Sequence, residues 1–210
     1  MRTLAAAVLL AAAVACREPS GRGPLVVILG DSLTAGWRIS RWEAFPARLE
    51  KLLRDRGRPA RVVNAGVSGE TVAQGRARLP GLLARRPDVL VVALGINDGL
   101  RNLPLEAAEA GLHDIVAQAR SNGVRVLLVG MRLPRAADPD YARRFADIYP
   151  RVAADLRLPL VPFLLEGVAG RPELHFADGI HPTAAGHERL AENVRPQLEL
   201  VLAEVERESR

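Results

Sequence analysis

Short, continuously apolar runs alternate along this chain with longer stretches whose apolar residues recur every three or four positions. The apolar runs are rich in β-branched residues, which is typical of strands buried on both faces of a sheet. They occupy residues 25–29, 61–64, 89–94, 124–129 and 160–165, and the helical stretches occupy 42–56, 71–86, 105–122, 140–157 and 183–208. Because parallel strands need a crossover and a helix supplies one, the alternation predicts an α/β fold. We expect a three-layer, flavodoxin-like α/β/α sandwich with a parallel sheet of about five strands.

The composition fits one globular domain. The chain has 210 residues, of which 49% are hydrophobic and 25% charged, values that are ordinary for a packed domain and argue against disorder. Neither an internal repeat nor a low-complexity tract interrupts residues 25–210, so we assign this range to a single domain.

The first residues have the pattern of a targeting signal. Met1 and Arg2 form a short basic start, and residues 4–15 are uninterrupted small and apolar residues, too few to span a bilayer. We therefore predict a signal peptide at 1–15, a linker at 16–24, and secretion to the periplasm or cell envelope of a bacterium. The single cysteine, Cys16, follows a stretch similar to a lipoprotein cleavage box, which leaves two alternatives open: a lipid anchor on Cys16, or plain secretion.

The charge pattern argues against a nucleic-acid partner. The net charge is +5, but the cations are arginines scattered among acids, with Lys51 the one lysine, and only 4% of residues are aromatic. Nucleic-acid-binding proteins concentrate cations on one face, often among aromatic side chains. We expect a small-molecule partner, no nucleic acid, and a monomer.

Polar and glycine-rich segments follow the predicted strands. The first strand runs into residues 30–36, GDSLTAG; the second ends in residues 64–69, NAGVSG; the third ends in residues 95–99, GINDG; and residues 178–182, DGIHP, follow the fifth. In open α/β sheets, ligands bind beyond the carboxyl ends of the strands. The four segments therefore predict an active site at one edge of the sheet.

These segments hold the groups that acyl transfer requires. Ser32 is the candidate nucleophile, His181 its general base, and Asp178 the carboxylate that orients the imidazole. We expect the oxyanion to be stabilised by the backbone N–H groups of Ser32 and Gly66 and by the side-chain amide of Asn97.

Residues of the same segments also fit two other chemical roles. Ser68 is an alternative hydroxyl, but it lacks the glycine-framed turn that surrounds Ser32. Asp31, Asp98 and Asp178 with His181 are candidate metal ligands, but no HxH, HExxH or paired-cysteine motif accompanies them. We therefore expect Asp31 to stabilise the turn, and we expect neither a metal nor an organic cofactor.

The blocks GDSLTAG, NAGVSGET, GIND and DGIHP, in this order, resemble those of the SGNH (GDSL) hydrolase family. Further matches around residues 78–80, 97–101, 132–134 and 148–150 are similar to its thioesterase I, arylesterase and lysophospholipase branch. The resemblance implies an acyl-binding groove flanked by Leu100, Leu133 and Pro134. Ile96 and residues 135–139 depart from the branch pattern beside this groove.

The resemblance implies a serine esterase or thioesterase that acts through an acyl-serine intermediate. Its expected substrates are aryl, alkyl or acyl esters, and also acyl thioesters or lysophospholipids. Two alternatives stay open at this point: a carbohydrate O-acetyl esterase of the same family, and a non-catalytic lipid-binding surface lipoprotein.

Overall fold

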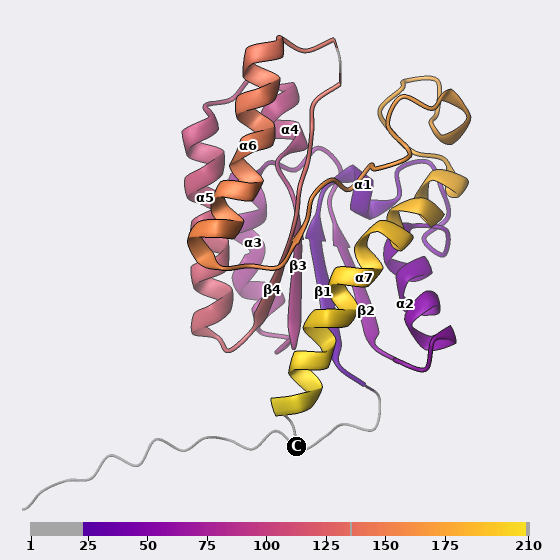
Figure 1. Cartoon of the computed structure of the whole chain (residues 1–210), viewed down its shortest axis with the longest axis vertical. Coiled ribbons are helices and arrows are strands. Elements are labelled where there is room, and N and C mark those ends of the chain that lie inside the picture. The colour runs from indigo at the N-terminus through magenta and orange to yellow at the C-terminus, as the bar shows by residue number, and fades with distance from the viewer. Residues whose placement is uncertain (1–22, 135, 209–210) are drawn as a thin grey trace, which may run out of the picture.

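The computed structural model, which describes residues 23–134 and 136–208, is built around a five-stranded parallel sheet (Figure 1). Its strands are β1 (Leu25–Gly30), β2 (Arg61–Gly66), β3 (Val89–Ala93), β4 (Arg125–Val129) and β5 (Leu160–Val161), in the order β2-β1-β3-β4-β5. The central strands β1 and β3 are buried along their whole length, as the continuous apolar runs indicate. The predicted α/β/α sandwich is confirmed. The predicted signal peptide and Cys16 lie outside the described residues.

Helices cover both faces of the sheet. Helices α3 (Val72–Leu83), α5 (Leu105–Ser121) and α6 (Pro139–Leu156) lie on one side, and α2 (Phe45–Asp55) and α7 (Ala184–Glu208) on the other (Figure 1). Each helix buries an apolar stripe; in α2, for example, Phe45, Leu49 and Leu53 recur every four residues and are fully buried. The stripe is what holds each helix against the sheet.

The connections at the carboxyl ends of the strands contain short helices that the sequence pattern did not predict. Helix α1 (Ser32–Ala35) follows β1, α4 (Ile96–Leu100) follows β3, and the 3-10 helix η1 (Pro172–Leu174) precedes α7. The fifth strand is shorter than the predicted 160–165, and that boundary was wrong. Strand β5 ends at Val161, and the chain leaves the strand register there, with the Leu164 N–H donating to the Gly130 carbonyl at 2.9 Å.

Strand β2 lies at an edge of the sheet, and side chains of the same chain occupy two of its outward-pointing donors. Val67 N–H donates to Gly30 of β1, so alternate N–H groups point away from the sheet. Of these, Val62 N–H donates to Glu50 (2.7 Å), and Gly66 N–H donates to the Oδ1 of Asn64 (2.9 Å). Unpaired donors on an edge strand would otherwise be open to another strand.

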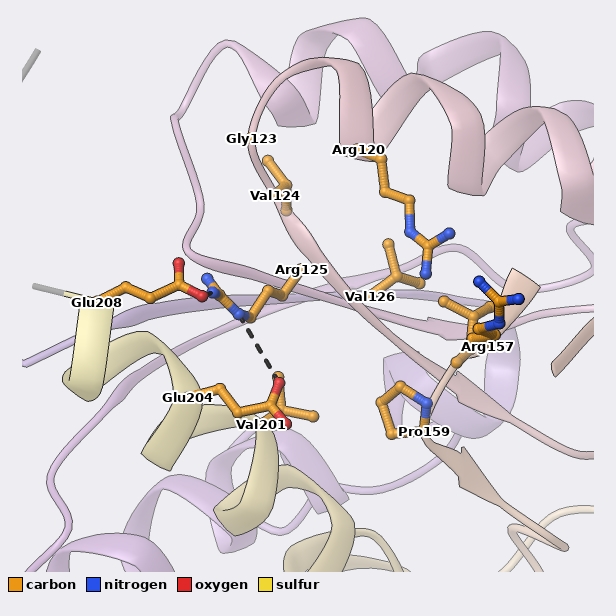
Figure 2. A pocket seen from close by; sticks show the side chains of 11 residues that line it. Arg120, Gly123, Val124, Arg125, Val126, Arg157, Pro159, Val201, Glu204 and Glu208 are labelled. Atoms are coloured by element: carbon orange, nitrogen blue, oxygen red, sulfur yellow. Dashed lines mark ion pairs between the residues drawn. The ribbon is translucent and has the colours of Figure 1, made fainter. Parts of the chain in front are cut away.

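A surface pocket lies at the amino-terminal end of β4, on the opposite side of the molecule from the carboxyl ends of the strands (Figure 2). Arg125 of β4 forms ion pairs there with Glu204 and Glu208 of α7, which tie the last helix to the sheet. The residues that line this pocket include no serine, cysteine or histidine, and we assign the pocket no catalytic role.

None of the helices in the described part of the chain is both long and apolar enough to cross a bilayer.

Candidate active site

Ser32 is the first residue of α1, directly after the end of β1. Asp31 caps this helix, since its Oδ1 accepts the Leu33 N–H at 2.9 Å, and Gly36 ends it in the left-handed conformation with φ of 81°. A four-residue helix held at both ends gives the Ser32 hydroxyl a fixed direction at the carboxyl edge of the sheet. The predicted structural role of Asp31 is the one observed.

The structure brings Ser32, His181 and Asp178 together. His181 Nε2 lies 3.0 Å from Ser32 Oγ, and His181 Nδ1 lies 2.9 Å from Asp178 Oδ2. The other carboxylate oxygen of Asp178 accepts the backbone N–H groups of Ile180 and His181, each at 2.9 Å. One short loop therefore fixes the carboxylate, and the carboxylate fixes the imidazole.

The environment keeps Asp178 ionised. Its limited burial tends to raise the pKa, but the hydrogen bonds from His181 and Ile180 N–H, with the contact to the imidazole, lower the pKa to about 2. Hydrogen bonds to a carboxylate favour its charged form. Asp178 is thus an anion wherever the enzyme is folded near neutral pH, and it can stabilise a positive charge on His181.

Asp31 has the opposite electrostatic character. Burial, reinforced by the charges of Glu70 and Asp98, raises the pKa of Asp31 to about 7, although the hydrogen bond from Leu33 N–H counteracts the rise. Its Oδ2 is buried without a hydrogen-bond partner among the described residues. The pKa values of Asp31 and Asp178 are therefore shifted in opposite directions because their surroundings differ.

Trp37 forms a wall against the imidazole. Its ring stacks on His181, with centroids 4.1 Å apart and 30° between the planes, and it meets Phe176 edge to face. The Arg38 guanidinium lies 4.3 Å from the Trp37 ring centroid. The sequence pattern did not reveal this contact, because position 37 is distant from 181 along the chain.

Gly66 does not have the role expected from the sequence. Its N–H points away from β1 and donates to Asn64, so it is not directed at a substrate beside Ser32. A Cβ at this position would lie 2.2 Å from the Ala35 nitrogen. The expectation of an oxyanion donor at Gly66 was therefore wrong: the missing side chain allows α1 to pack closely on β2.

Gly69, three residues further along the same block, has a backbone N–H that is not engaged in this way. Its φ of 80° suits glycine, and its N–H has no acceptor within residues 23–134 and 136–208. The next residue, Glu70, accepts the Asn97 side-chain amide on its carbonyl at 3.1 Å, so Asn97 lies beside this turn. The sequence analysis named Gly66 alone, because the strand register that turns its N–H toward Asn64 is not visible in the sequence.

A cavity of about 650 Å³ opens along the loops at this edge. It contains all three residues that the sequence predicted for the acyl groove, Leu100, Leu133 and Pro134. Ile96, which the resemblance placed beside this groove, also lines the cavity. The other apolar lining residues, Leu33, Phe163, Leu165 and Ile180, had not been predicted, and Arg132 and His175 add polar groups to the wall. Leu33 and Ile180 are the chain neighbours of Ser32 and His181, so the cavity adjoins the two segments that carry these residues.

Other ionisable groups near the site have local partners. His175 Nδ1 lies 3.0 Å from the Arg171 carbonyl, and the buried His187 accepts the Phe45 N–H at 3.1 Å. Asp98 accepts the Val72 N–H at 2.9 Å. Across residues 23–134 and 136–208, no three His, Cys, Asp or Glu side chains come together as a metal site would require.

A parallel α/β/α sandwich with a serine–histidine–aspartate contact chain at the carboxyl edge of its sheet has the construction of a serine hydrolase. Residues 28–189 match the GDSL-like Lipase/Acylhydrolase family, and the chain belongs to that family. The family predicted from the four sequence blocks is confirmed.

The relatives are ester hydrolases. Esterase TesA of Pseudomonas aeruginosa is 43% identical over 178 residues, covering 84% of this chain and 89% of the relative. Thioesterase 1/protease 1/lysophospholipase L1 of Escherichia coli is 39% identical over 175 residues, covering 83% of each. A crystal structure of TesA matches the fold with a TM-score of 0.82, over 84% of this chain and 99% of that one. The chain is thus an ester-hydrolysing enzyme.

Proposed function

We propose that this enzyme hydrolyses acyl esters and thioesters through a covalent acyl intermediate on Ser32. The observation that carries the proposal is the unbroken contact chain from Ser32 Oγ to His181 Nε2 at 3.0 Å, and from His181 Nδ1 to Asp178 Oδ2 at 2.9 Å. These are hydrogen-bond distances, which proton transfer between nucleophile and base requires.

In the first half-reaction, Ser32 Oγ attacks the carbonyl carbon while its proton passes to His181 Nε2. The anionic Asp178 stabilises the imidazolium, and it keeps a proton on Nδ1, the ring nitrogen that faces the carboxylate. When the tetrahedral intermediate collapses, the bond to the leaving alcohol or thiol breaks, and His181 returns the proton to it. Water then attacks the acyl-Ser32 by the same sequence, which releases the acid and restores the serine.

The developing oxyanion needs donors that are in place before the reaction. We assign this role to the Ser32 N–H, the Gly69 N–H and the Asn97 side-chain amide. One Asn97 proton is held by the Glu70 carbonyl, and the amide has a second proton for the substrate.

The apolar cavity beside Ser32 is assigned to the acyl chain, because burial of a hydrocarbon chain against Leu33, Leu100 and Leu133 removes apolar surface from water. At about 650 Å³, the cavity is of a size that accepts more than an acetyl group. This favours medium acyl esters, thioesters and lysophospholipids over acetylated sugars.

Reaction with a fluorophosphonate tests the nucleophile. We expect one adduct per molecule, mapped by mass spectrometry to Ser32, and no adduct on Ser32→Ala, while Ser68→Ala is labelled like the wild type. Full turnover by Ser32→Ala would refute the mechanism.

A series of p-nitrophenyl esters and acyl thioesters of rising chain length tests the groove. Leu133→Trp narrows the cavity and should move the optimum to shorter chains. Leu200→Trp is the matched control, since Leu200 is 62% exposed on α7. An unchanged chain-length profile for Leu133→Trp would place the acyl chain elsewhere.

Secretion to the cell envelope, and the lipid anchor on Cys16, remain predictions of the sequence. Mass spectrometry of the mature N-terminus decides between the lipid anchor and plain secretion.

A further inference from the structure

A buried ion pair lies under the oxyanion side of the site. Arg78 of α3 donates from Nε to one carboxylate oxygen of Glu70 at 2.6 Å and from Nη2 to the other. The Glu70 side chain is 5% exposed and that of Arg78 is 27% exposed. Desolvation offsets much of the attraction within such a pair, so it contributes little net stability. A bidentate contact between a guanidinium and a carboxylate nevertheless fixes the relative orientation of the two groups closely.

The same guanidinium reaches the ends of two strands. Arg78 Nη2 donates to the carbonyl of Ala65, in β2, at 2.6 Å, and lies 3.4 Å from the carbonyl of Gly30, in β1. Gly30 immediately precedes Asp31 and Ser32. One side chain therefore joins the strand that carries the nucleophile to the strand that leads into the Gly69 turn.

Glu70 uses its backbone as well as its side chain. Its N–H donates to the Val67 carbonyl at 3.2 Å, which closes the turn containing Gly69, and its carbonyl accepts the Asn97 amide at 3.1 Å. Arg101, one turn after Asn97, donates to the Gly69 carbonyl at 2.8 Å. Both groups assigned as donors beyond Ser32, the Gly69 N–H and the Asn97 amide, are thus attached to the segment that Arg78 holds.

We propose that Glu70 and Arg78 are positioning residues for transition-state stabilisation. Their ion pair anchors the turn Val67–Glu70 to the ends of β1 and β2, and so keeps the Gly69 N–H and the Asn97 amide at a fixed place relative to Ser32. The inference rests on the proposed function, because it assigns a support to the donors named there. Neither residue touches the substrate.

Glu70→Gln is the first test, since it preserves shape and removes the charge. A lost oxyanion donor typically slows kcat about 10²–10³-fold, and a displaced donor should cost less, about 10-fold. KM should stay within about twofold, because ground-state binding belongs to the apolar cavity. Affinity for an arylboronic acid, which forms a tetrahedral adduct on the serine, should fall in parallel with kcat.

Glu109→Gln is the matched control. Arg151 of α6 binds Glu109 of α5 through the same two-point geometry, with Nε–Oε1 of 3.1 Å and Nη2–Oε2 of 2.8 Å. Both kcat and boronate affinity should be unchanged in this variant. If Glu70→Gln does not fold, Arg78→Lys provides the same test, because lysine keeps the charge but loses the fork.

A double-mutant comparison separates positioning from general destabilisation. In an Asn97→Ala background, Glu70→Gln should slow kcat by clearly less than its effect on the wild type, since one of the supported donors is already absent. In an Asp178→Asn background, the loss of kcat caused by Glu70→Gln should multiply with the loss caused by Asp178→Asn, because Asp178 does not support the oxyanion donors. An unchanged kcat for Glu70→Gln, or losses that multiply fully with Asn97→Ala, would overturn the inference. Phosphonate labelling of Ser32 under those conditions would leave the proposed function standing.

Discussion

His187 is a buried base whose uncharged form stabilises the folded chain. It is 1% exposed on α7, its Nδ1 accepts the N–H of Phe45 at the start of α2, and its ring stacks on that of Phe45. Burial, with a smaller contribution from the charge of His181, lowers the pKa of His187 from 6.5 to about 4. The substitution to examine is His187→Asn, because asparagine places an acceptor where Nδ1 was and does not titrate.

The direction in which stability changes with pH follows from the number of protons that the unfolded and folded chains bind. Between pH 6.5 and about 4, the unfolded histidine binds a proton that the folded one excludes, so stability is present above this range and is lost as the pH falls through it. The free energy of unfolding should fall by about 2 kcal/mol between pH 7 and pH 5 from this residue, and by about 3 kcal/mol at pH 4.

Urea unfolding at pH 7, 5 and 4, followed by circular dichroism, measures the effect. The wild type should lose stability relative to His187→Asn as the pH falls. Asp31 acts in the opposite direction: its pKa is raised to about 7, so its contribution is present at low pH and is lost as the pH rises from about 4 to 7. It is common to both proteins and cancels in the difference. If the difference in free energy of unfolding between the wild type and His187→Asn stayed constant within about 0.5 kcal/mol from pH 7 to pH 4, that result would refute the argument.

Three further outcomes are expected. Asp178→Asn should lower kcat about 10³–10⁴-fold in steady-state assays without unfolding the protein, because an amide does not hold the productive tautomer of His181; a loss below tenfold would contradict this. Trp37→Ala should lower kcat about 3–10-fold through the lost stacking on His181, with Trp37→Phe retaining most of the activity; equal losses in both would exclude stacking as the cause. Arg157 ends α6 with φ of 49°, so Arg157→Gly should raise the free energy of unfolding by about 1 kcal/mol in urea titration, and a lower urea midpoint would count against backbone strain there.

Much of the scaffold could be predicted because it follows from burial and periodicity. The buried runs at 25–29 and 89–94 became β1 and β3, and the helical stretch at 105–122 became α5. The strand order β2-β1-β3-β4-β5 could not be read in the same way, because it depends on which crossover passes over which face. The short helices α1 and α4 span four and five residues, too few for a periodic pattern to register.

The candidate site also contains residues that could be predicted from the sequence and residues that could not. Ser32, Asp178 and His181 could be named because acyl transfer needs those chemical groups, and each lies beside a strand end or in a loop after one. Gly66 was wrong because a glycine's direction depends on strand register, which composition does not encode. Glu70 and Arg78 fall in two separate matching segments of the sequence, and only the packing of α3 against the ends of β1 and β2 shows that they form a pair.

The capped edge of β2 has a consequence for the behaviour of the enzyme in a crowded solution. Two side chains, Glu50 and Asn64, cover donors that a neighbouring molecule would otherwise use to extend the sheet. Each of these side chains opposes the pairing of β2 with a strand of another molecule, which is a first step of aggregation. Asn64 has a second role, because its Nδ2 donates to the Thr34 carbonyl of α1 at 2.9 Å. One side chain therefore serves both the solubility of the enzyme and the placement of the helix that carries Ser32.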